Sequence, residues 1–135
     1  MAELKFTEAF AKYGAKLANP MWAFSAIAEG GSLVLSCWQH KFSMPEKGVL
    51  RYSDKLSRWK GENHLGKNLL TSHITQAYEQ NLPVRLVIAT TSEPARVDAG
   101  EDASALPKTF HLKENVVGHV VSFDGDSYVI DFNEV

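Results

Sequence analysis

Two stretches of alternating side chains, joined by a short glycine-rich connection, most constrain how this chain folds. Residues 21–28 and 32–38 each alternate with a period of two, which is typical of β-strands. The connection at 29–31 contains two glycines, which tolerate the positive φ angles of a tight turn. The pattern therefore predicts a β-hairpin that places Trp22 and Trp38 near its open end.

Further strands are predicted in the second half of the chain. Residues 116–123 and 126–132 are rich in β-branched residues and flank Asp124-Gly125, and Asp-Gly is a strong hairpin signal. Residues 84–90 (VRLVIAT) carry a single charge, which predicts a central strand that is buried on both faces. A short strand is also predicted at 109–112.

Apolar residues at steps of three and four predict two amphipathic helices. The second helix runs from about 64 to 80, with Asn63 as a candidate N-cap. The first covers about three turns and ends at Asn19-Pro20, because the residue before proline is pushed out of the α region. Its apolar stripe consists of Leu4 or Phe6, Phe10, Tyr13 and Leu17.

Two segments lack a regular period. Residues 39–63 are polar and basic, so we expect a structured loop with one short strand at 49–52. Residues 92–106 are rich in Ala, Glu, Asp and Pro, which predicts a mobile surface loop. Because regular βαβ alternation is absent, the expected fold is a single α+β domain spanning 1–135. Its simplest form is a small curved mixed sheet or half-barrel with two flanking helices.

The composition is that of a globular protein, with 44% apolar and 22% charged residues. No apolar run is long enough to cross a bilayer, and the N-terminus lacks the pattern of a secretory signal, so we expect a cytoplasmic protein. The single cysteine, Cys37, lies in an apolar run and cannot form an internal disulfide. We expect it to be a small buried hydrophobe.

The sequence contains none of the common catalytic or cofactor motifs. It has no glycine-rich phosphate loop, GxSxG elbow, HExxH or paired CxxC, and its five histidines lack the close spacing of metal ligands. We therefore expect no metal or other cofactor. An enzyme would have to use a site built from His40, Asp54, His73 or Arg85, although His73 and Arg85 also fit ordinary places at the edge of a core.

Charge is distributed unevenly along the chain. Residues 41–67 hold seven basic and three acidic residues, whereas residues 93–135 hold three basic and nine acidic residues. Opposite patches on one surface favour self-association or binding to an oppositely charged protein. A homodimer or a protein-interaction role is therefore one interpretation of the sequence.

Aromatic and cationic residues alternate from the end of the first hairpin through the basic segment. Such a mixture suits nucleic acid, because aromatic rings stack on bases while Lys and Arg hold phosphates. Tryptophans on strands also fit a hydrophobic core, and basic loops are often simply solvated. The candidate binding residues are Trp22, Trp38, His40, Arg51, Lys55, Arg58, Trp59 and Lys60.

A family resemblance rests on dispersed apolar and tryptophan positions over about two-thirds of the chain. The run Trp22-Ala23-Phe24-Ser25-Ala26, then Gly31, Val34, Leu35 and Trp38, then a long helix and residues 84–89, resembles modules that accompany bacterial modification-dependent restriction systems. Those modules are similar to the PUA-like group, which includes the EVE, ASCH and SRA domains. The resemblance implies a small curved β-barrel that grips nucleic acid and accepts a modified or flipped base in an aromatic-lined pocket.

The sequence therefore favours a small module that binds a ligand or nucleic acid and senses a modified base through an aromatic and basic pocket. A protein-interaction or structural homodimer is the alternative, and a small enzyme with an unrecognised site ranks third. The chain carries no nuclease motif of its own, which fits a sensing module, whereas its acidic C-terminal half departs from the usual pattern of a DNA-binding protein.

Overall fold

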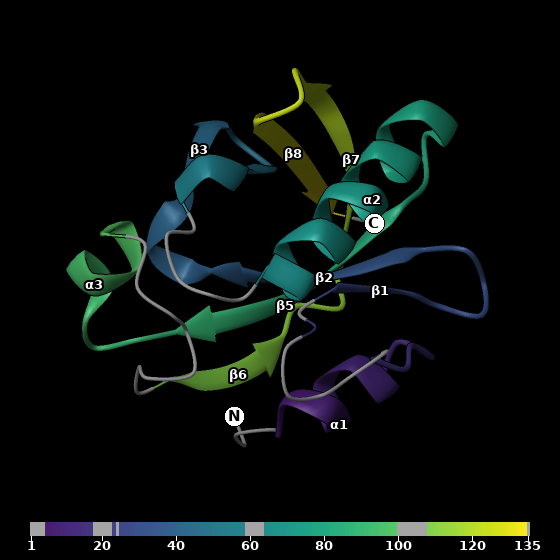
Figure 1. Ribbon diagram of the computed structural model, residues 1–135, viewed down its shortest axis with the longest axis horizontal. Coiled ribbons are helices and arrows are strands. Elements are labelled where there is room, and N and C mark those ends of the chain that lie inside the picture. The colour runs from purple at the N-terminus through teal and green to yellow at the C-terminus, as the bar shows by residue number, and fades with distance from the viewer. Residues whose placement is uncertain (1–4, 18–22, 24, 59–63, 100–107, 135) are drawn as a thin grey trace.

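The computed structural model describes residues 5–17, 23, 25–58, 64–99 and 108–134. Over these residues the chain forms one eight-stranded mixed sheet with three α-helices (Figure 1). The predicted α+β class and the mixed sheet are confirmed. The strands are β1 (Ser25–Ile27), β2 (Leu33–Trp38), β3 (Phe42–Glu46), β4 (Val49–Lys55), β5 (Val84–Thr90), β6 (Thr109–Leu112), β7 (Val116–Phe123) and β8 (Ser127–Glu134).

The sheet is open, with strand order β1-β2-β5-β7-β8-β4-β3, and it does not curl into the half-barrel that was one expected form. The ladder between β2 and β5 is parallel, and the other pairs are antiparallel. Strand β5 pairs with β7 at its start and with β6 along its second half. The central position predicted for this strand is therefore confirmed.

Helices cover both faces of the β2–β5 pair. On one face α2 (His64–Gln80) places Leu70 and Ile74 in the same cluster as Leu35. On the other face α1 (Phe6–Ala11) packs Phe10 in a second cluster with Val34, the neighbour of Leu35 on β2. Figure 1 shows α2 in front of the sheet and α1 on the other side from α2, next to β6. Because successive side chains of a strand point to opposite faces, an apolar run such as β2 serves both clusters.

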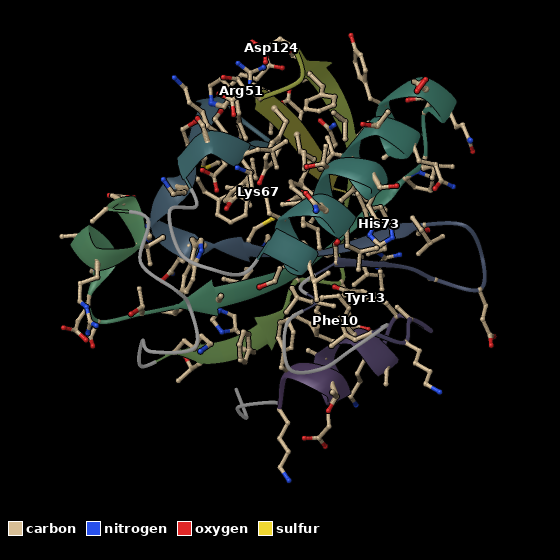
Figure 2. The ribbon with its side chains drawn as sticks, in the orientation of Figure 1. Phe10, Tyr13, Arg51, Lys67, His73 and Asp124 are labelled. Atoms are coloured by element: carbon tan, nitrogen blue, oxygen red, sulfur yellow. The ribbon has the colours of Figure 1, made fainter. Side chains whose placement is uncertain are left out.

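Helix α1 is shorter than the predicted three turns. It ends at Ala11, and Gly14 has φ 76°, a left-handed conformation that a right-handed helix cannot continue through. The residues of the predicted apolar stripe still contact the body of the protein after the helix ends. Leu17 is buried, and the Tyr13 hydroxyl donates a hydrogen bond to the Leu86 carbonyl at 2.8 Å. Phe10 and Tyr13 lie between α1 and the sheet (Figure 2).

The predicted basic loop is largely a third hairpin. Strands β3 and β4 pair across a turn at Gly48, which has φ 85°. The sequence signal is weak because β3 is an edge strand with mostly exposed residues, and its Pro45 cannot donate a ladder hydrogen bond. The predicted short strand at 49–52 is the first part of β4.

The segment predicted as a mobile loop begins with a short helix, α3 (Pro94–Asp98). Val97 belongs to the main core, with 1% of its surface exposed, so α3 is attached to the body of the protein. Residues 100–107 of this segment lie outside the described residues.

The two predicted hairpins are confirmed at β1–β2 and β7–β8, with positive φ at Gly31 and Gly125 in their turns. The second helix is confirmed over 64–80, and Cys37 is buried as expected. Among the described residues, none of the helices has the length and apolar character needed to cross a membrane.

Candidate binding pocket

The β4–β8 ladder brings the basic and the acidic segments of the sequence side by side. Arg51 and Asp131 are directly opposite each other, and the Nε and Nη2 atoms of Arg51 donate to the two carboxylate oxygens at 2.7 and 2.8 Å. The hydrogen bond from Arg51 lowers the pKa of Asp131 below its ordinary value. The two segments therefore neutralise part of each other's charge within one molecule.

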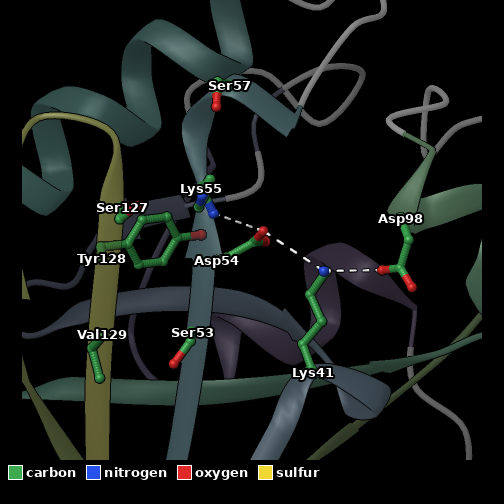
Figure 3. Close-up of a pocket in the computed structure, with 9 residues that line it drawn as sticks. All are labelled: Lys41, Ser53, Asp54, Lys55, Ser57, Asp98, Ser127, Tyr128 and Val129. Carbon is green, nitrogen blue, oxygen red and sulfur yellow. Dashed lines mark hydrogen bonds and ion pairs between the residues drawn. The ribbon is translucent and has the colours of Figure 1, made fainter.

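A pocket of about 580 Å³ opens at the end of this ladder (Figure 3). Its walls come from β4 and the 3-10 turn that follows it, from β8, from the residue before β3 and from the last residue of α3. Two lysines, two aspartates and three serines supply its polar groups, although most of the exposed lining surface is apolar. The lining residues are Lys41, Ser53, Asp54, Lys55, Ser57, Asp98, Ser127, Tyr128 and Val129.

Asp54 holds a buried carboxylate in this wall, with 2% of its side chain exposed. Its Oδ2 accepts a hydrogen bond from the Tyr52 hydroxyl at 3.2 Å, and its Oδ1 accepts one from the Lys55 backbone N–H at 2.8 Å. The same Tyr52 hydroxyl accepts a hydrogen bond from the backbone N–H of Trp38 at 3.3 Å. Burial raises the pKa of Tyr52 well above its ordinary value. The phenol therefore stays protonated and donates a hydrogen bond to Asp54.

Lys41 lies between the carboxylates of Asp54 and Asp98. Its Nζ is 3.0 Å from Asp98 Oδ1 and 3.9 Å from Asp54 Oδ1. The Nε2 atom of His40 also contacts Asp98 Oδ1, at 3.1 Å. The hydrogen bond from Lys41 is the main cause that lowers the pKa of Asp98. His40 and Lys41 belong to a single 3-10 turn, Gln39–Lys41, which links β2 to β3.

Hydroxyl groups and one exposed lysine complete the rim. Lys55 and Ser127 are cross-strand partners at the end of the ladder. Ser57 lies in the 3-10 turn Leu56–Arg58 that follows β4. Its backbone N–H and its hydroxyl donate hydrogen bonds to the carboxylate of Asp126 at 2.7 and 2.9 Å. The pocket thus presents cationic groups and neutral hydrogen-bonding groups at one opening.

The structure brings together some of the predicted binding residues. Lys55 lines the pocket, and His40 contacts its wall through Asp98. Arg51 is engaged by Asp131, and Trp38 is 8% exposed, so its ring packs in the core instead of offering an open face for stacking. Trp22, Trp59 and Lys60 lie outside the described residues, as does the side chain of Arg58.

The four residues named for an enzymatic site do not converge. His40 and Asp54 are both near Lys41, but the ring of His73 bonds Ser25 through Nδ1 at 2.8 Å, between α2 and β1. Arg85 lies with its guanidinium 4.9 Å from the ring centre of Tyr13 and donates to the Glu114 carbonyl. Figure 2 shows His73 well separated from Arg51 and Asp124.

Several pocket residues were not among the sequence candidates. No sequence pattern marked Asp98 as a binding residue, because it lies in an acidic segment that was predicted to be a loop. Ser53, Ser57 and Ser127 are small polar residues of a kind found on any protein surface. Lys41 was counted with the basic segment but not assigned to a site. Within the described part of the chain, His, Cys, Asp and Glu form no group of three or more that could hold a metal ion.

Comparisons with known proteins add little. No protein-family model matches the chain, and no curated protein matches it at a significant level. Among solved structures, the chain is similar to "crystal structure of KRYPTONITE in complex with mCHG DNA and SAH", with 14% sequence identity and a TM-score of 0.35. The match covers 99% of this chain and 26% of that chain, so this chain spans about a quarter of its length. At this TM-score the likeness assigns neither a fold family nor a function to the chain.

Proposed function

We propose that this protein is a small module that binds a phosphate-bearing ligand, a nucleotide unit of a nucleic acid, in the pocket at the end of the β4–β8 ladder. The observation that carries this proposal is the convergence of Lys41 and Lys55 with three serine hydroxyls around one opening. A volume of about 580 Å³ lies within the range of roughly 300 to 1,000 Å³ that is usual for small-molecule sites.

The chemistry of the rim matches the parts of a nucleotide. Ammonium groups of lysine bind phosphate oxygens as point charges. Hydroxyl groups both donate and accept, so Ser53 and Ser57 can bond to the sugar or to the edge of a base. Apolar contact is available from Tyr128 and Val129, which line the same pocket.

The charges of the pocket limit how much nucleic acid it holds. Asp54 and Asp98 offset the two lysines, so the pocket is not a strongly basic channel. It fits one or two phosphates rather than a long stretch of backbone. This favours recognition of a single nucleotide, as a base-sensing module requires.

The finer proposal concerns a modified base and the residues after Ser57. Trp59 follows Ser57 by two positions in the sequence, and Arg58 and Lys60 flank it. We keep Trp59 as the proposed stacking residue, because base–aromatic stacking contributes roughly 1–3 kcal/mol per base. Trp38 is left out of this role, since its ring is buried.

Binding to short oligonucleotides tests the proposal. Plain and base-modified single and double strands are titrated into wild-type protein and into Lys55→Ala, Arg58→Ala and Trp59→Ala. Lys47→Ala is the matched control, because Lys47 is exposed in the β3–β4 turn and does not line the pocket.

We expect Lys55→Ala to weaken binding to all sequences alike and to reduce the salt slope by roughly 0.7 for single strands and 0.9 for double strands, as the loss of one phosphate contact does. Lys47→Ala should bind like wild type. Equal behaviour of Lys55→Ala and Lys47→Ala would contradict the pocket, and no binding of wild type to any oligonucleotide would contradict the function. Preference for a modified base that is lost in Trp59→Ala would support the finer proposal.

A further inference from the structure

Two nitrogen donors converge on one carboxylate oxygen at the mouth of the pocket. Asp98 Oδ1 lies 3.0 Å from Lys41 Nζ and 3.1 Å from His40 Nε2, both within hydrogen-bond distance. The two donors come from adjacent residues of the turn between β2 and β3, whereas the carboxylate comes from α3. Figure 3 shows the carboxylate of Asp98 beside the ammonium group of Lys41.

We infer that His40 and Lys41 form an anion site for a terminal phosphate, and that Asp98 occupies this site as an internal competitor. This inference rests on the pocket proposed above as a nucleotide site. It assigns the phosphate position within that pocket and makes Asp98 an autoinhibitory residue.

Displacement of Asp98 by a ligand is physically feasible because its side chain is 55% exposed. Exposed ion pairs contribute little to stability, since water and salt screen them. A phosphate monoester carries a charge of about −1.5 to −2 at pH 7 and has three acceptor oxygens. It can therefore replace both contacts of Asp98 with a larger charge.

The two sides of the site can separate without loss of the fold. Val97, the residue before Asp98, is anchored in the main core, so α3 does not depend on the contact with Lys41. On the other side, the carboxylate of Asp54 lies 3.9 Å from Lys41 Nζ, which favours an ammonium group at the pocket after Asp98 has moved away.

Inorganic pyrophosphate is the probe that tests this site without a base or sugar. We would titrate it into the full chain and follow the backbone amides of His40, Lys41 and Asp98 by NMR. The variants are Asp98→Ala, Asp98→Asn, and Asp98→Ala combined with Lys41→Ala. Glu79→Gln is the control, because it removes one negative charge from an exposed residue of α2 that does not line the pocket.

We expect Asp98→Ala to bind pyrophosphate about two- to fivefold more tightly than wild type, the ratio that corresponds to an exposed ion pair. Asp98→Asn should also gain affinity, and this variant carries the test if the alanine variant does not fold. Glu79→Gln should match wild type, and the double variant should lose the gain. Unchanged or weaker binding by folded Asp98→Ala and Asp98→Asn overturns the inference, as does an equal gain in Glu79→Gln.

The outcome is separable from that of the proposed function. Oligonucleotide binding is measured on the same preparations. A gain for pyrophosphate in the Asp98 variants, without binding of any oligonucleotide to wild type or variants, supports the anion site and contradicts the nucleic-acid function. Oligonucleotide binding that depends on Lys55, without a gain in the Asp98 variants, supports the function and overturns the competitor role of Asp98.

Discussion

A buried carboxylate needs several hydrogen-bond donors or cationic groups around it. Asp54 has such partners within its own strand and at the mouth of the pocket. The Tyr52 hydroxyl and the Lys55 backbone N–H donate to its two oxygens, and the ammonium group of Lys41 lies nearby. Burial of such a charge is costly unless it is paired and hydrogen-bonded. These contacts therefore explain why the Tyr52 hydroxyl and the ammonium group of Lys41 lie beside Asp54.

Gly118 shows a second residue whose type is dictated by its neighbours. A Cβ atom at this position would lie 2.6 Å from Cδ1 of Phe132, its fully buried cross-strand partner. We expect Gly118→Ala to lower the free energy of unfolding by about 1–3 kcal/mol, the usual cost of overpacking a core. Urea denaturation measures the difference.

Gly30→Ala is the matched control for this prediction. Gly30 has a negative φ and no atoms within contact distance of the added methyl group, so we expect a change within about 0.5 kcal/mol. A similar loss in both variants would mean that glycine itself, rather than the contact with Phe132, accounts for the effect.

At the scale of elements, the sequence predicted those with strong local signals. The turns with Gly31 and Gly125, the apolar run of β5 and the periodic helix α2 are all as expected. It did not predict β3, whose exposed residues and proline resemble a loop, or α3, which has five residues and a single buried side chain. Edge strands and short helices take their form from neighbouring elements, which a local pattern does not contain.

The contact between α2 and β1 predicts a pH dependence of stability. Burial lowers the pKa of His73 below its ordinary value of 6.5, and its Nδ1 is paired with the hydroxyl of Ser25. The unfolded state therefore takes up a proton at higher pH than the folded state does. This part of the stability is fully present above pH 6.5 and is lost as the pH falls through the lowered folded-state pKa.

His73→Gln isolates this effect, because glutamine keeps a hydrogen-bonding group and does not titrate. We expect the free energy of unfolding of wild type to fall more between pH 7 and pH 5 than that of the variant, as measured by denaturant titrations at each pH. Parallel curves for the two proteins would show that His73 does not contribute to the pH dependence.

At the scale of the whole molecule, the fold rearranges the charge that the sequence displays. The basic and acidic segments look like separate patches along the chain, but the β4–β8 ladder and the contact of α3 with the β2–β3 turn place them against each other. The candidate pocket arises from this juxtaposition. It could not be predicted from the sequence because Asp98, Lys41 and Ser127 come from three distant segments whose pairing depends on the strand order.

The same juxtaposition predicts a weak dependence of nucleic-acid binding on salt. If only the pocket lysines contact phosphates, the slope of log affinity against log salt for a single strand should be roughly −0.7 to −1.4, which corresponds to one or two phosphates. If instead the four Lys and Arg residues named from the sequence (Arg51, Lys55, Arg58 and Lys60) acted together as an open patch, four contacts would give a slope of about −2.8. Affinities measured at several salt concentrations distinguish the two. A steep slope would mean that Arg51 leaves Asp131 on binding, and that the internal ion pairs of this fold open to receive the nucleic acid.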